Sequence, residues 1–232
     1  MIDRSVRSLY TVGEKTAEKL NRLGIYTVRD IQERSDEIRE KFGKHGRLIT
    51  ELAFGIDDRK VIAYKPEDAK SLSREITFQE DVNNYDLVDD VLVLLSLSVA
   101  ERAARHGLHG KGVTLKLTYH DMQNITRSRV VTSADSAGDI YPELVRMLAQ
   151  VEHRPVRLIG AGIYNMTGDE GMQMTLDDYM EETSAEKQAV IDRRLAELGE
   201  RYGLDFAGHL QDIYKGMTLY RTIEYMRKHF PG

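Results

Sequence analysis

The spacing of the hydrophobic positions changes along the chain, and the change predicts two folded parts of different kinds. Over residues 1–56 the apolar residues recur every three or four positions, which is the period of short amphipathic helices. The predicted helices cover residues 16–23, 28–38 and 48–54. Gly24 is placed to end the first of them. We therefore expect a small all-α domain over residues 1–56.

Residues 70–167 mix the strand period with the helix period. Alternating apolar and polar residues predict strands at residues 72–78, 113–119, 125–131 and 156–163. Longer helical patterns predict helices at residues 87–105 and 140–151. The resulting order, β-α-β-β-α-β, is that of ferredoxin-like domains. The expected fold class is α+β, with a ferredoxin-like domain over residues 70–167.

Two polar segments separate the predicted parts. Residues 57–69, which include Pro66, are predicted to be an interdomain linker. Residues 168–183 are acidic and predicted to be a second linker. Thr183 and Glu186 have the spacing of a capping box, so residues 184–232 are expected to form a helical tail. Its second helix is predicted over residues 217–229.

Composition narrows the class of protein and shows where the charge lies. The chain has no Cys, which excludes disulfides and thiolate metal sites and fits a reducing cytoplasm. No apolar run approaches the ~20 residues of a membrane span, and residues 1–20 lack a signal peptide. The net charge is −5, but residues 1–168 hold as many basic as acidic side chains. A local basic surface for nucleic acid is therefore compatible with the total charge.

A glycine turn stands before the first predicted helix. Gly13 is followed by Lys15 and Thr16, and a glycine at a helix N-terminus lets backbone N–H groups approach a phosphate. The pattern resembles a helix-hairpin-helix motif, which holds the DNA backbone without reading bases. Its usual form has two glycines flanking an apolar residue, whereas the first position here is Thr11. The alternative is an ordinary helical turn in which glycine only marks the helix start.

A second candidate for phosphate binding lies on the third predicted strand. It comprises Thr126, Arg127, Ser128 and Arg129, beside the outward-facing Thr114, Lys116 and Thr118 of the strand before it. Hydroxyl and guanidinium groups suit phosphate oxygens. The alternative is a solvated sheet face, in which Lys and Arg guard the edge against aggregation.

We find no arrangement of residues that predicts catalysis or metal binding. The seven histidines include no metal-binding spacing, and His106 and His109 are expected to be solvated or capping. Adjacent acidic pairs such as Asp89 and Asp90 point to different sides of an element and are interpreted as solvated charges. No phosphate-binding loop or nucleophile motif is present.

Four segments in order together resemble one protein family. They are Val12 to Ile31, Lys70 to Val82, Val113 to Val131 and Val156 to Ile163. The set is similar to the C-terminal half of Y-family lesion-bypass DNA polymerases, of the DNA polymerase IV or UmuC-like type. The resemblance implies that residues 1–56 are a thumb domain with a helix-hairpin-helix motif. It implies that residues 70–167 are a little finger domain that lies along primer–template DNA.

The same resemblance implies a set of DNA-contacting residues. Those in the thumb are Gly13, Lys15 and Thr16. Those in the little finger are Ser73, Arg74, Lys116, Thr126, Arg127, Ser128 and Arg129. Contacts of this kind are independent of base sequence, as a lesion-tolerant polymerase requires, and depend strongly on salt.

The palm and fingers of the family, which hold two Mg²⁺ ions, have no counterpart in this sequence. We expect no cofactor in this chain and no polymerisation by it alone, so its standing as an enzyme is open. One interpretation is the C-terminal region of a DNA-directed polymerase in translesion synthesis. The alternative is a stand-alone, palm-less interaction protein that binds DNA or the sliding clamp and regulates a polymerase. Met1 is compatible with both.

Family members often carry a clamp-binding peptide after the little finger. Gln173, Met174, Leu176 and Tyr179 stand in that place, but Asp177 occupies the usual aromatic position. The alternative is a plain acidic linker. The expected partners are primer–template DNA, the sliding clamp and a polymerase catalytic half, with no membrane. The expected location is the bacterial cytoplasm, in association with the nucleoid.

Overall fold

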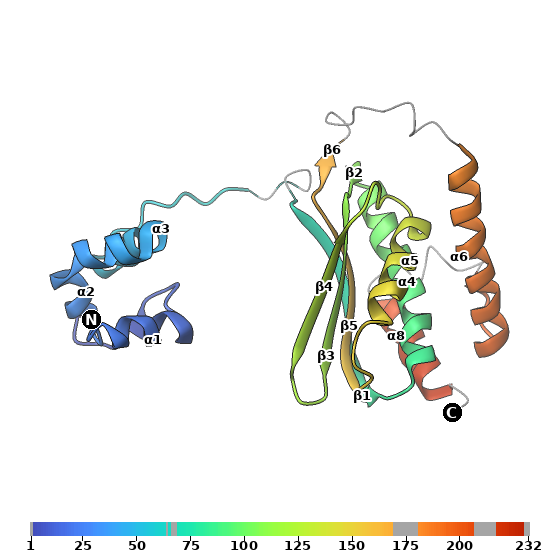
Figure 1. Ribbon diagram of the computed structural model, residues 1–232, viewed down its shortest axis with the longest axis horizontal. Coiled ribbons are helices and arrows are strands. Elements are labelled where there is room, and N and C mark those ends of the chain that lie inside the picture. Colours follow the sequence, from blue (N-terminus) through green and yellow to red (C-terminus); the bar gives the residue numbers. More distant parts are fainter. Residues whose placement is uncertain (1, 64, 66–68, 169–180, 207–216, 230–232) are drawn as a thin grey trace. The chain divides into compact units, whose positions relative to one another are not determined.

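A computed structural model describes residues 2–63, 65, 69–168, 181–206 and 217–229 (Figure 1). The chain divides into two compact units, Met1–Ala63 and Tyr64–Gly232. The division falls within the segment expected to be a linker. Each unit has a hydrophobic core of its own.

The N-terminal unit is entirely helical. It contains the 3-10 helix η1 (Val6–Ser8), α1 (Glu14–Arg22), α2 (Val28–Glu33) and α3 (Ser35–Ala53). Thr27 and Asp30 form a capping box that begins α2, with Thr27 Oγ1 accepting from the Asp30 amide at 3.2 Å. The predicted helix over 28–38 is wrong in one respect, because α2 ends at Glu33 and α3 begins at Ser35. Leu20, Ile31 and Ile49 are among the buried residues that hold the helices together.

The C-terminal unit is built on a four-stranded antiparallel sheet. Its strands are β1 (Ser71–Val82), β3 (Gly112–Tyr119), β4 (Asn124–Val130) and β5 (Val156–Tyr164), in the order β1-β5-β3-β4. Two helices follow the predicted pattern, α4 (Tyr85–Ala104) and α5 (Ala137–Leu148). A separate two-stranded sheet pairs β2 (Leu108–His109) with β6 (Thr167–Gly168). The expected α+β class and the β-α-β-β-α-β order of the main elements are confirmed.

The strand order within the sheet differs from the ferredoxin-like prediction. A ferredoxin-like sheet has its first and third strands in the centre. Here the central strands are β5 and β3, which are the fourth and second main strands along the chain. Each helix still joins two parallel strands that have a third strand between them, since β1 and β3 both pair antiparallel with β5. The periodicity of a sequence predicts the elements, but it does not determine which strands pair.

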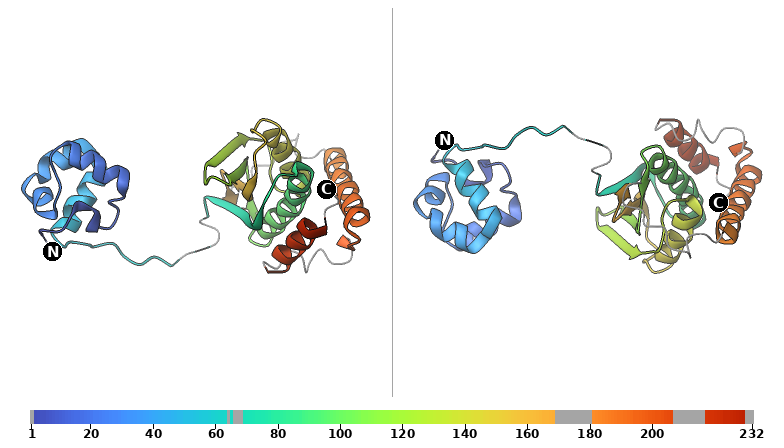
Figure 2. Two further views of the ribbon diagram at one scale, coloured as in Figure 1. Left: turned by 90° about the horizontal axis from the view of Figure 1, so that it is seen from below. Right: turned by 90° about the horizontal axis from the view of Figure 1, so that it is seen from above.

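Two further helices form a third layer over the helical side of the sheet. They are α6 (Glu181–Tyr202) and α8 (Met217–His229), and α6 begins two residues before the predicted cap at Thr183. Figure 2 shows the sheet on one side, α4 and α5 against it, and α6 and α8 outside them. Buried residues of the outer layer join the same core: Ile191, Leu195, Leu198, Leu219, Ile223 and Met226. The helical tail therefore packs on the body of the unit.

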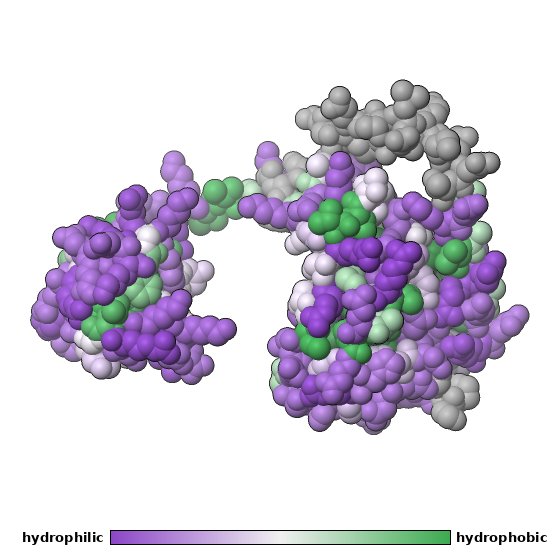
Figure 3. All heavy atoms as spheres, viewed as in Figure 1, coloured by the Kyte–Doolittle hydropathy of each residue, from purple (hydrophilic) through white to green (hydrophobic). Residues whose placement is uncertain are grey.

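Helix α4 is buried on nearly all sides because the sheet lies on one flank and the outer helices lie on the other. In the residues described, no helix combines the length and the apolar character that a membrane crossing requires. At the surface seen in Figure 3, hydrophobic side chains lie in small separate groups among hydrophilic ones.

Candidate nucleic-acid interface

The predicted glycine turn lies at the exposed start of α1. Gly13 is the N-cap residue, with φ −78° and ψ 179°, and makes no side-chain cap. A Cβ added to Gly13 would meet no heavy atom within 4 Å. Neither the backbone conformation nor the packing therefore requires glycine at this position. Lys15 is exposed and Thr16 is half-buried in the first turn. An open helix N-terminus beside a lysine is an arrangement that suits an anion such as phosphate.

Thr11, which departs from the two-glycine pattern, has the backbone conformation of a glycine. Its φ is +74°, in the left-handed region where a β-branched residue is strained. Its Oγ1 is buried and has no hydrogen-bond partner among the described residues. Thr11 therefore holds a backbone conformation that glycine adopts without strain, although the residue is a threonine.

The open face of the sheet collects the polar residues of alternate positions. Helices α4 and α5 cover the other face (Figures 1 and 2). Residues opposite one another across strands share a face, so the register assigns the predicted residues. One row across the sheet consists of Ser73, Gly162, Thr114 and Ser128, and the next consists of Glu75, Gly160, Lys116 and Thr126. The structure thus brings Ser73, Lys116, Thr126 and Ser128 together on one surface.

Arg127 and Arg129 lie on the opposite side of β4, which corrects the prediction of a single strip over residues 126–129. Arg127 is paired in register with Leu115, and Arg129 with Val113, both of which are buried under the helices. Successive side chains of a strand point to opposite faces. The alternation of the strand predicts this placement, because Arg127 and Arg129 are two and four residues after the apolar Ile125 and so lie on the same face as Ile125.

Arg74, which the resemblance also assigns to the DNA contact, lies on the helical side of β1, whereas Ser73 lies on the open face. Its Nε donates to Ser98 Oγ of α4 at 3.2 Å. The side chain is half-buried, and it occupies the same face of β1 as the buried Leu72 and Ile76. Arg74 and Ser73 therefore contribute to different surfaces at the β1 edge of the sheet.

Two glycines leave the middle of the open face bare, and neither was among the predicted site residues. Gly160 and Gly162 both lie in β5 and share the open face. A Cβ added to Gly162 would lie 3.0 Å from Ser73 Cβ, and one added to Gly160 would lie 2.7 Å from Glu75 Cγ. The signal was their spacing of two within a strand, which places both on one side. A side-chain-free strip lets another backbone approach the sheet closely.

The positive charge of this region is concentrated at the β4 edge. On the open face, Lys116 Nζ lies 2.7 Å from Glu75 Oε2, so the pair has little net charge. On the other side of β4, Glu143 of α5 contacts both Arg129, at 3.2 Å, and Arg146, at 2.5 Å. Arg127 is exposed, and its side chain has only a 3.4 Å contact with the Thr126 carbonyl among the described residues. Glu143 is thus shared by two arginines, and Arg127 has no acidic partner among the described residues.

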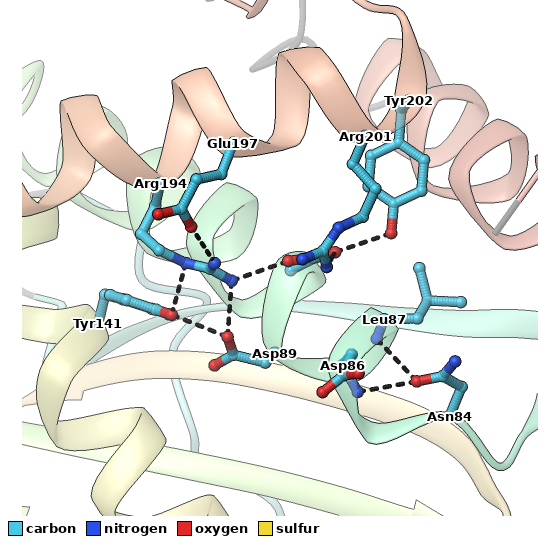
Figure 4. Close-up of polar contacts among 10 residues, drawn as sticks. Asn84, Asp86, Leu87, Asp89, Tyr141, Arg194, Glu197, Arg201 and Tyr202 are labelled. Carbon is cyan, nitrogen blue, oxygen red and sulfur yellow. Dashed lines mark hydrogen bonds and ion pairs between the residues drawn. The ribbon is translucent and has the colours of Figure 1, made fainter. Parts of the chain in front are cut away.

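The acidic pair Asp89 and Asp90 is not solvated, contrary to the prediction. Asn84 caps the start of α4 and places the two carboxylates one turn later (Figure 4). Asp90 is fully buried and accepts from Arg194 at 2.8 Å, Arg201 at 2.7 Å and Tyr202 at 2.8 Å. The partners belong to α6, so this cluster attaches that helix to α4.

Asp89 is only partly compensated within the same cluster. Its Oδ2 accepts from Arg194 at 2.7 Å and from the Tyr141 hydroxyl at 2.9 Å. Burial raises the pKa of Asp89 above its ordinary value, and these two contacts oppose the shift. Burial, together with the neighbouring Asp90 carboxylate, likewise raises the pKa of the Tyr202 hydroxyl. Across the described ranges, no group of three His, Cys, Asp or Glu residues is arranged to hold a metal ion.

The predicted clamp peptide lies outside the described residues. Its members are Gln173, Met174, Leu176 and Tyr179.

Comparison with known proteins places this architecture in one family. A family model described as the impB/mucB/samB family C-terminal domain matches residues 69–176. DNA polymerase IV of Alkalilimnicola ehrlichii is 36% identical over 177 residues, which cover 74% of this chain and 49% of that protein. DNA polymerase IV of Desulfatibacillum aliphaticivorans is 32% identical over 203 residues, which cover 85% and 50%. The chain spans about half the length of the curated relatives it matches.

Among solved structures, a Y-family DNA polymerase chimera has a similar fold. Its TM-score is 0.53, at 20% sequence identity, over 70% of this chain and 47% of that chain. The similarity in sequence and in fold confirms the resemblance found in the four sequence segments. Residues 69–176 match the impB/mucB/samB family C-terminal domain, and the similarity to DNA polymerase IV over about half of its length is consistent with the C-terminal half of a Y-family DNA polymerase.

Proposed function

We propose that this chain binds the backbone of primer–template DNA, independently of base sequence, as the C-terminal region of a Y-family translesion polymerase. The observation that carries the proposal is the open sheet face, which displays hydroxyls and bare glycines and ends at an arginine-rich edge. Its members are Ser73, Thr114, Thr126, Ser128, Gly160 and Gly162 on the face, with Arg127 and Arg129 at the edge.

Strand β4 is the centre of this proposed contact. Among the strands that the structure describes, it pairs only with β3, so its other edge presents backbone N–H groups that no described strand pairs. Thr126 and Ser128 lie on one side of that edge, and Arg127 and Arg129 lie on the other. A phosphate backbone that follows the edge receives N–H groups from the strand itself and charged donors from the arginines. None of these groups needs to reach a base edge, which suits an enzyme that copies damaged templates.

The N-terminal unit has the corresponding role of a thumb in this proposal, and the C-terminal unit that of a little finger. Gly13 supports the role of the N-terminal unit as a thumb. No protein atom lies within 4 Å of a Cβ added to Gly13, and its backbone conformation is one that other residues also adopt. A phosphate at the start of α1 fills that space and accepts from the first backbone N–H groups. Lys15 then adds a positive charge to the contact.

Polymerisation itself, and the Mg²⁺ that it needs, are proposed to reside in the part of the relatives that this chain does not match. The described residues contain no carboxylate cluster for two metal ions. Binding and orienting DNA is the contribution that the present units supply.

Fluorescence anisotropy with labelled primer–template DNA tests the proposal at two salt concentrations. The predicted result is binding at low salt that weakens steeply as salt rises, and that changes little between unrelated DNA sequences. Absence of binding at low salt, or binding that is indifferent to salt, contradicts the proposal.

A further inference from the structure

We propose that a pocket beside strand β1 binds a phosphate group of the DNA backbone and forms a second anchor, at the opposite edge of the sheet from β4. The pocket has a volume of about 250 Å³ and is lined by Ala69, Ser71, Leu72, Ser73, Arg102 and His106, among others. The inference rests on the proposed function, and it adds Arg102 and His106 to the residues that the family resemblance assigns.

The position of the pocket follows from the edge location of β1. Within the described part of the chain, strand β1 pairs only with β5, so its outer edge is where the open face meets the helical layer. Ser73 belongs to the open face, whereas Arg102 lies one turn beyond Ser98 in α4 and His106 follows the end of that helix. Arg74, which donates to Ser98, lies on the helical side of the same strand. The pocket therefore opens at the boundary between the two faces.

The lining of the pocket has the chemistry of a phosphate site. It offers two hydroxyls, one guanidinium and one imidazole, and it contains no carboxylate. Arg102 and His106 are exposed, and neither side chain has a hydrogen bond or ion pair with another described residue. In contrast, Arg105 Nη2 lies 2.5 Å from Glu101 Oε2 on the same helix. Arg102 is thus the cation of this helix end that has no compensating acid.

A second pocket on this unit lacks these features. It has a volume of about 300 Å³ and includes Asp86 and Arg154 in its lining. Arg154 is already paired with Asp121, so its charge is compensated. The comparison favours the pocket at the β1 edge as the anion site.

The spacing of the two anchors suits a duplex. Four strands at about 4.8 Å separation place the outer strands about 14 Å apart, which is close to the ~12 Å width of the DNA major groove. In the proposal, the β1 pocket and the β4 arginines hold phosphates at the two edges of the sheet. A backbone clamp of this kind fixes the DNA across the sheet without any base contact.

The experiment compares Arg102→Ala with Arg105→Ala in the full chain. Both variants remove one arginine from the last part of α4, but only the first removes a group from the pocket. Anisotropy with primer–template DNA is measured over a salt series. We expect Arg102→Ala to weaken binding about tenfold and to lower the slope of log K against log salt by about one. Arg105→Ala is expected to leave the slope unchanged.

If wild-type DNA binding is salt-dependent and the two variants behave alike, the pocket is not a phosphate site, and the proposed function still stands. If the wild type does not bind DNA at low salt, the proposed function fails and the pocket proposal fails with it. A thermal melt of each variant checks that the fold is retained, which the exposure of both arginines favours.

Competition with inorganic phosphate distinguishes the two sources of the ligand. If phosphate displaces DNA more than chloride does at equal ionic strength, and this difference is absent in Arg102→Ala, the pocket also binds free phosphate. Equal displacement by both salts, together with the lowered slope of Arg102→Ala, assigns the pocket to the DNA backbone alone. Both results support the proposal.

Discussion

Ser128 and Arg129 are neighbours in strand β4, yet they project to opposite faces of the sheet. Ser128 Oγ lies 2.9 Å from Thr114 Oγ1 on the open face, and Arg129 Nε lies 3.2 Å from Glu143 on the helical side. The strand edge between them is exposed. In the proposed complex, a DNA backbone along this edge meets hydroxyls from one side and guanidinium groups from the other.

Arg127→Ala is expected to weaken DNA binding more than Arg129→Ala does. Arg129 is already attracted to Glu143, whereas Arg127 has no acidic partner among the residues described. The predicted loss for Arg127→Ala is about 1 kcal/mol, with a salt slope lowered by about one. Anisotropy over a salt series measures both quantities. Arg221→Ala, in the outer layer on α8, is the control. An equal effect of the control would remove Arg127 from the site.

Gly13→Ser is expected to change stability and DNA binding in opposite directions. Serine is a good N-cap residue, so the free energy of unfolding of the N-terminal unit rises by a few tenths of a kcal/mol. The added side chain occupies the space proposed for a phosphate, and binding therefore weakens. Thermal melting and anisotropy measure the two effects. Unchanged affinity would show that glycine at this position has no role in binding.

Thr11→Gly is expected to stabilise the N-terminal unit by about 1 kcal/mol. Glycine accepts the positive φ of +74° without strain, and the substitution also removes the unpartnered buried hydroxyl. Native-state hydrogen exchange of the α1 and α2 amides isolates this unit from the other. Faster exchange in the variant is the result that contradicts the prediction.

Asp90→Asn is expected to destabilise the C-terminal unit by about 3 kcal/mol, because the two arginines of α6 then lack their buried counter-charge. Both Arg194 and Arg201 donate to this carboxylate. Urea unfolding measures the loss. Limited proteolysis should cut α6 in this variant first, since the cluster attaches that helix to α4. A loss below about 1 kcal/mol would show that apolar packing alone holds the outer layer.

Asp89 is expected to give the stability a pH dependence of unusual sign for a carboxylate. Because burial raises its pKa, the folded chain binds a proton there more readily than the unfolded chain does. The contribution of Asp89 to stability therefore falls as pH rises from the ordinary range of Asp through the folded pKa. Urea unfolding between about pH 4 and 7 compares wild type with Asp89→Asn, which should lack this slope.

Asp81→Asn is the matched control for that measurement. Arg157 lowers the pKa of Asp81, so this carboxylate stabilises the fold above its unfolded pKa and loses its effect as pH falls. Its removal should reduce the acid-side loss of stability and leave the Asp89 slope in place. An identical pH profile for wild type and Asp89→Asn would contradict the assignment.

The order of the elements could be predicted because hydrophobic periodicity is a local property. Strands such as residues 113–119 alternate cleanly, and the observed β3 is Gly112–Tyr119. Strand pairing is a long-range property, which explains why the ferredoxin-like order was wrong. The burial of Asp90 has the same origin, since its partners Arg194 and Arg201 lie more than a hundred residues away in the sequence.

The residues of the candidate site were predicted from their chemical type. The face of the sheet on which each of them lies depends instead on whether its position in the strand is odd or even. Alternate residues of β4 share a face of the sheet. Thr126 and Ser128 therefore lie together on the open face, and Arg127 and Arg129 lie together on the helical side. Counting alternate positions from the apolar Ile125 would have separated them. No local signal marks Arg102, because its pocket is formed by β1 and α4, which meet only in the folded unit.

The most direct test of the central claim is an NMR titration of the full chain with unlabelled primer–template DNA. Binding through the open face and the β4 edge predicts amide shifts in β3, β4 and the first turn of α1. It also predicts that the solvent-facing amides of α6 and α8 stay unchanged. Shifts confined to α6 and α8, with β4 unaffected, would contradict the proposed DNA-binding surface.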